Sequence, residues 1–121
     1  MGNRVHVVKK HAKYGSSEAF NWNTEGFHSL LSMLGAHPTE MNRTLDFECE
    51  VSDYRHAKDT LQRYKSVGWD THVAEALDGY EESDLKEELE KVGGLDYALG
   101  AMVAFWKEKD PDSNWISFVS F

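Results

Sequence analysis

Residues 44–51 constrain the fold more than any other stretch, because from Leu45 onward their side chains alternate strictly between apolar and acidic. The apolar members fall on one side and the acidic members on the other: Leu45, Phe47, Cys49 and Val51 against Asp46, Glu48 and Glu50. Such alternation is typical of a β-strand with one face on a core and the other toward water or a partner. The chain therefore needs a sheet that is covered on one side, as antiparallel and mixed sheets often are.

The remaining elements follow from apolar spacing along the chain. Residues 4–10 and 115–121 are predicted to be strands, the second with apolar groups on both faces. Helical spacing of apolar side chains recurs in five segments: residues 24–34, 52–67, 71–80, 84–92 and 95–106. Gly35 and Gly68 follow two of these segments, where a left-handed C-terminal residue belongs.

These segments predict an α+β fold with a small mixed or antiparallel three-stranded sheet. The expected order is β-α-β-α-α-α-α-β, with the helices packed mainly on one face. We expect one domain over residues 1–121, because the length suits one domain and no repeat or linker interrupts it. With 40% hydrophobic and 12% aromatic residues, the chain can form a real core.

Charge is distributed unevenly between the two parts of the chain. The net charge is −8 overall, yet residues 1–45 carry five Lys/Arg and three Glu, a net of +2. Residues 46–121 carry eight Lys/Arg and eighteen Asp/Glu, a net of −10. This excess of anions argues against direct binding of nucleic acid and permits binding to a basic protein surface.

Two acidic strips are candidate partner-binding surfaces. Residues 78–90 hold seven acids and one lysine, and most of these acids are expected on the wet side of a helix. The acidic face of the 44–51 strand forms the second strip. The candidate partner-binding residues are Asp46, Glu48, Glu50, Glu81, Asp84, Glu87 and Glu88. The alternatives are a solvated helix face and charges that prevent unwanted pairing of an edge strand.

A second interpretation places a ligand site near the loop at residues 11–22. Its candidate residues are His11, Tyr14 and Trp22, joined by His56 or His72. The chain contains no HExxH metal motif, no glycine-rich phosphate loop and no GxSxG nucleophile motif. The sequence therefore predicts no metal or cofactor and identifies no catalytic residue, so an enzyme is the less favoured class.

The favoured hypothesis is a non-catalytic, acidic interaction protein that binds a basic protein surface as an inhibitor or adaptor. One form of it is an anti-defence protein that mimics nucleic acid and occupies the binding surface of a nucleic-acid-handling enzyme. The alternatives are a small enzyme or ligand-binding domain, and a subunit of a larger assembly or homo-oligomer. With one cysteine, no apolar signal segment and no run of about twenty apolar residues, we expect a cytoplasmic protein outside the membrane.

Overall fold

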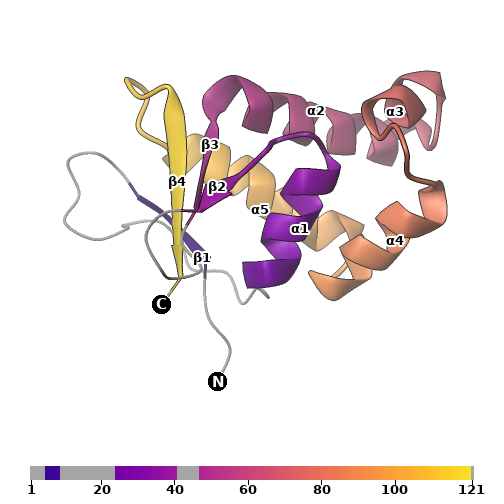
Figure 1. The fold of residues 1–121 in the computed structure, drawn as a ribbon, viewed down its shortest axis with the longest axis horizontal. Coiled ribbons are helices and arrows are strands. Elements are labelled where there is room, and N and C mark those ends of the chain that lie inside the picture. Colours follow the sequence, from indigo (N-terminus) through magenta and orange to yellow (C-terminus); the bar gives the residue numbers. More distant parts are fainter. Residues whose placement is uncertain (1–4, 9–23, 41–46, 121) are drawn as a thin grey trace.

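The computed structural model describes residues 5–8, 24–40 and 47–120, as four strands and five helices (Figure 1). The strands are β1 (Val5–Val8), β2 (Thr39–Glu40), β3 (Phe47–Glu50) and β4 (Trp115–Ser120). The helices are α1 (Thr24–Met33), α2 (Val51–Val67), α3 (Thr71–Ala76), α4 (Glu82–Lys91) and α5 (Leu95–Glu108). Within these ranges no helix is both long and apolar enough to cross a membrane.

The strands form one antiparallel sheet in the order β1-β4-β3-β2. Phe47 lies opposite Phe118 and Cys49 opposite Ile116, and all four side chains are buried. Their neighbours Glu48, Glu50, Trp115 and Ser117 lie on the other face and are exposed or half-buried. The predicted α+β fold with a small antiparallel sheet is therefore confirmed, and the two-residue β2 is an addition to the expected order.

Local signals explain where several helices begin and end. The Asp70 carboxylate accepts a hydrogen bond of 2.9 Å from the backbone N–H of Val73 and so caps α3. The backbone N–H of Glu81 donates to the Asp84 carboxylate at 2.8 Å at the start of α4. Gly68 follows α2 with φ of +81°, a conformation that side chains with a Cβ rarely adopt. The two hydrogen bonds therefore stabilise the first turns of α3 and α4.

An aromatic cluster centred on Phe118 joins the sheet to the helices. Its ring lies 5.0 Å from Phe47, 5.2 Å from Phe27 and 5.5 Å from Phe105, measured between centroids. Tyr54 completes the cluster at 5.7 Å. Because these rings come from β3, β4, α1, α2 and α5, one buried cluster connects five elements. The covered face of the sheet is the face that carries this core.

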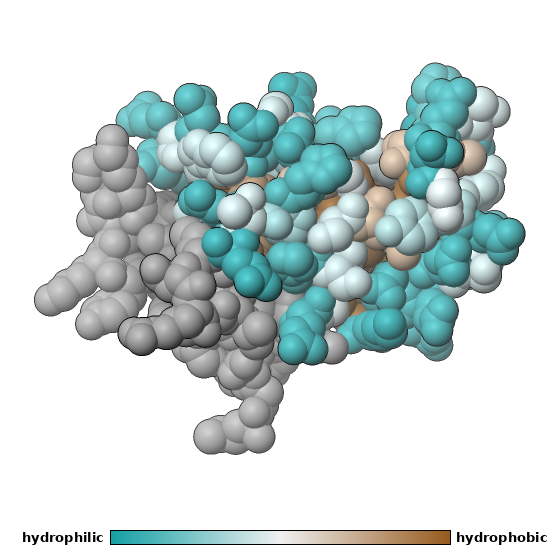
Figure 2. Space-filling model, in the orientation of Figure 1, coloured by the Kyte–Doolittle hydropathy of each residue, from teal (hydrophilic) through white to brown (hydrophobic). Residues whose placement is uncertain are grey.

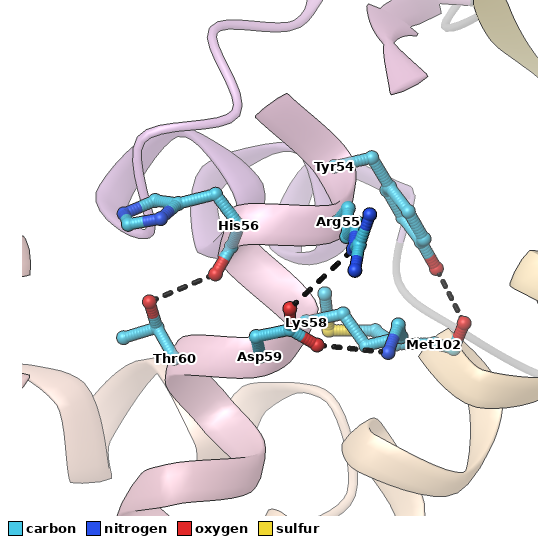
Figure 3. A network of polar contacts seen from close by, with 7 residues as sticks. All are labelled: Tyr54, Arg55, His56, Lys58, Asp59, Thr60 and Met102. Carbon is cyan, nitrogen blue, oxygen red and sulfur yellow. Dashed lines mark hydrogen bonds and ion pairs between the residues drawn. The ribbon is translucent and has the colours of Figure 1, made fainter. Parts of the chain in front are cut away.

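Tyr54 also fixes α2 against α5 through a buried hydrogen bond. Its hydroxyl donates to the backbone carbonyl of Met102 at 2.8 Å (Figure 3). Burial raises the pKa of Tyr54 well above its ordinary value, so the group stays a neutral donor. The contact spans 48 positions of sequence and lies in the core, so it orients α2 against α5.

Replacing Tyr54 with Phe should destabilise the fold by about 1 kcal/mol, the usual net value of one buried hydrogen bond. The ring and its packing remain, so only the hydroxyl is lost. The free energy of unfolding, measured in urea, checks this. Tyr80→Phe is the matched control, because that side chain is 46% exposed. A Tyr54→Phe loss no larger than that of the control would contradict the role assigned to the bond.

Cys49 should be unreactive while the protein is folded. Burial, followed by the charges of Asp53 and Glu48, raises the pKa of this thiol to about 12, and only the thiolate is nucleophilic. We expect a disulfide reagent at neutral pH to modify the folded protein at least ~100-fold more slowly than the unfolded protein. Cys49 is the only cysteine in the sequence, so the signal is unambiguous. Similar rates in both states would show that this face of the sheet is open.

Candidate functional site

The end of the molecule formed by α3 and α4 carries a concentration of exposed acids. Figure 2 shows mainly hydrophilic side chains over this end. The exposed members, which we call the acidic end, are Glu75, Asp78, Glu81, Glu87 and Glu90. Two of the predicted partner-binding residues at this end, Glu81 and Glu87, are thus exposed, and Asp84 is half-buried.

The lysines around the acidic end already have acidic partners. Lys86 lies 3.8 Å from the Glu82 carboxylate, and Lys65 lies 2.9 Å from that of Asp96. Lys91 contacts Glu88 at 2.8 Å. The pairs of Lys86 and Lys65 are exposed and contribute little stability, but each pair neutralises charge locally. The charges left over at this end are therefore negative.

The expectation that Glu88 lies on the solvated face of its helix is wrong. Its side chain is only 11% exposed, because it lies on the side of α4 that packs against α1. The hydrogen bond from Lys91 lowers the pKa of Glu88, burial opposes this, and the nearby hydroxyl of Ser29 in α1 lowers it further. Glu88 therefore serves the packing of α4 on α1, and the charge of Lys91 balances it.

The second acidic strip lies apart from the first. Glu50 is exposed and Glu48 half-buried on the open face of the sheet, while Asp46 lies outside the described residues. β3 lies in the sheet, toward one end of the molecule's longest axis, and α4 lies toward the other end (Figure 1). The two strips are therefore separate surfaces, and a partner that covers one would have to be large to reach the other.

A groove lies beside the acidic end, between α4 and the start of α5. This α4–α5 groove has a volume of about 680 Å³ and receives one residue, Tyr64, from α2. Its complete lining is Tyr64, Ser83, Lys86, Glu87, Leu89, Glu90, Gly94 and Leu95. The tyrosine hydroxyl donates to Glu82 at 2.9 Å, which fixes the ring in the wall. Nothing in the sequence pattern shows this groove, because it forms only when three helices meet.

Two of the predicted ligand-binding residues, His56 and His72, come together in a second groove. This histidine groove, of about 430 Å³, lies between α2 and α3 and also contains Asp59, Arg63 and Glu75. Across the described ranges 24–40 and 47–120, no group of three or more His, Cys, Asp or Glu side chains is arranged to hold a metal ion. The other three members of the predicted site, His11, Tyr14 and Trp22, lie outside the described residues.

A third groove lies where the end of α5 meets the start of α2. Trp106 forms part of its lining, with Lys109 Nζ 4.7 Å and Lys58 Nζ 5.6 Å from the ring centroid. Asp59 contacts both Lys58, at 3.0 Å, and Arg55, at 3.8 Å. Figure 3 shows these charges together, with the His56 ring pointing away from them. The cations here are therefore engaged with a ring or a carboxylate, unlike the carboxylates of the acidic end.

The ion pair beside the histidine groove should make stability depend on pH. The hydrogen bond from Arg63, and then that from the Val73 backbone, hold the pKa of Asp70 below its ordinary value. A carboxyl whose pKa is depressed by folding stabilises the fold above its unfolded pKa, and this contribution is lost as pH falls through the folded pKa. Replacing Asp70 with Asn keeps a capping oxygen but removes the titration. The melting temperature of the wild type should exceed that of the variant at neutral pH.

This difference in melting temperature should shrink toward zero between about pH 5 and about pH 2. Arg63→Gln is a second test variant. It removes the largest cause of the lowered pKa of Asp70 and leaves the cap of α3 intact. A difference that stays constant over that range would show that Asp70 acts as a cap alone.

The comparisons with known proteins add no relative: no family model matches the chain, and neither a curated protein nor a solved structure matches it. The geometry of its own residues is therefore what indicates a function for this chain.

Proposed function

We propose that this chain is a non-catalytic interaction protein whose acidic end binds a basic surface of another protein, as an inhibitor or adaptor. The observation that carries the proposal is the set of exposed carboxylates on and between α3 and α4, beside lysines that already have partners. A surface with uncompensated negative charge attracts a positively charged partner and speeds its association. A cytoplasmic location is part of this proposal, because the free thiol of Cys49 suits a reducing compartment.

The separation of the two acidic strips favours a compact docking surface within this proposal. A protein that imitated a long stretch of nucleic acid would need a continuous row of negative charge, since duplex DNA carries one charge per ~1.7 Å of its axis. The acidic end and the strip with Glu48 and Glu50 are divided by the body of the molecule (Figure 1). An anti-defence inhibitor of this kind would thus cover a local basic site on an enzyme that handles nucleic acid.

A ligand-binding role is the second candidate, and the histidine groove favours it. His56 and His72 lie in one groove with Asp59 and Glu75, so imidazole and carboxylate groups face a common space. Convergent polar groups in a groove are typical of small-molecule sites, which are usually also more enclosed and apolar. The role would be supported by a ligand whose affinity depends on the protonation of both histidines.

The proposed function can be tested by removing charge at the acidic end. The triple variant Glu81→Gln, Glu87→Gln, Glu90→Gln keeps side-chain size and removes three negative charges. Immobilised wild type and variant are incubated with host-cell lysate at low and high salt. We expect the wild type to retain a basic protein at low salt only, and the variant to retain it about tenfold less.

A control triple removes the same charge from the sheet end: Glu48→Gln, Glu50→Gln, Asp112→Asn. We expect this variant to retain the partner as the wild type does. Equal retention by all three proteins, or retention that salt does not change, would overturn the proposal. Loss with the control triple alone would assign docking to the strip on the sheet.

A further inference from the structure

The α4–α5 groove combines an apolar floor with a rim of acids. Tyr64 and Leu89, at 8% and 4% exposure, form the floor together with the half-buried Leu95. These side chains belong to three packed helices, so the groove exists before anything binds. An apolar floor beside exposed carboxylates suits an occupant with an apolar part and a cationic part.

The rim has a defined order along α4. Ser83, Glu87 and Glu90 are four and then three residues apart, so they lie along one stripe of the helix. Lys86 is the cation of this lining, and it lies 3.8 Å from Glu82. An acidic occupant would be repelled by the two glutamates, and an apolar one would take their charges out of water without compensation. The charge of the rim therefore selects a cation.

Both backbone polar groups of Gly94, the glycine in the groove lining, already have hydrogen-bond partners within the chain. The Gly94 N–H donates to the Leu89 carbonyl at 2.8 Å, and the Gly94 carbonyl accepts from the Ala98 N–H at 3.0 Å. An incoming peptide therefore cannot pair with this segment as a strand would with a sheet edge. A helical occupant needs no such pairing, because its backbone hydrogen bonds are internal, so a helix suits this groove.

We propose that the α4–α5 groove binds an amphipathic, basic helix of a partner protein. An apolar side chain of that helix rests on Tyr64, Leu89 and Leu95, and lysine or arginine side chains on its flank reach Glu87 and Glu90. The inference rests on the proposed function and deepens it, because it names the chemistry of the partner and where it is held. The acids select a basic partner, and the floor gives it an anchor.

The probe for this proposal is a synthetic helix-forming peptide of leucine and lysine in amphipathic order. A second peptide has the same leucines, with glutamate at each lysine position. Binding of the labelled peptides to the full chain is measured by fluorescence anisotropy at low salt. We expect the leucine–lysine peptide to bind at least about tenfold more tightly than its acidic counterpart.

Two variants separate the groove from the general acidity of the chain. Ser83→Trp adds a large side chain at the exposed rim and removes no core atom, so it should fill the groove and weaken binding about tenfold or more. Glu75→Gln with Asp78→Asn removes two charges of the acidic end outside the lining, and should change affinity less than about threefold. Lys86→Glu adds charge at the rim and should strengthen binding, which provides a test if Ser83→Trp does not fold.

Each result has a defined meaning. Equal binding of the leucine–lysine peptide to the wild type, Ser83→Trp and Lys86→Glu would overturn the groove proposal and leave the acidic docking function standing. Binding of hexylamine at the groove residues, seen by NMR, without peptide binding would make it a small-molecule site and overturn the proposal too. Failure of the proposed function would be seen in a different experiment. In the lysate test, the variant with Glu81, Glu87 and Glu90 replaced would then retain the partner as well as the wild type does.

Discussion

The contact of Phe118 with its four aromatic neighbours is the interaction on which the rest of the structure depends. β4 is the last of the described strands in sequence, yet it lies between β1 and β3, so the sheet depends on contacts between distant parts of the chain. Phe118 then meets rings from α1, α2, α5 and β3 within 5.7 Å. Each such pair contributes about 0.5–1.5 kcal/mol beyond the burial of its surface. The register Phe47 to Phe118 therefore decides which face of the sheet is dry.

The same core determines where charge can gather. α2 and α5 extend away from the sheet, and α3 and α4 pack on their far ends, so one end is mostly helical (Figure 1). α4 buries Leu85 and Leu89 and meets the body through one side only. Its remaining sides are free to carry acids at little cost, because exposed like charges four residues apart cost a few tenths of a kcal/mol. The acidic end is thus compatible with the fold but not required by it.

The sequence predicts the parts of this structure that depend on local periodicity. The alternation at residues 47–50 identifies β3 and its dry face, and the helical spacing from residue 71 identifies the start of α3. What local patterns miss is decided by tertiary contacts. Glu88 is charged and therefore expected in water, but it lies three residues after Leu85 on the side of α4 that faces α1, so it is buried, and the exposed Lys91 pairs with it. The α4–α5 groove and the placement of His56 and His72 in one groove likewise depend on how the helices pack on one another, which local periodicity does not give.

The positions of the acids along α4 determine how a cation bound in the groove would affect the helix. A helix stabilises negative charge at its N-terminus and positive charge at its C-terminus. Glu82 and Asp84 lie in the first turn, where the dipole favours them, but Glu90 lies in the last turn, where it does not. Glu87 stands three residues before Glu90, so the two also repel each other, and Lys91 offsets this for Glu87. Glu87 and Glu90 are also the acids that line the groove. A cation bound beside them would offset both the unfavourable interaction of Glu90 with the helix dipole and the repulsion between Glu87 and Glu90. Binding there would therefore also stabilise the last turn of α4 against fraying.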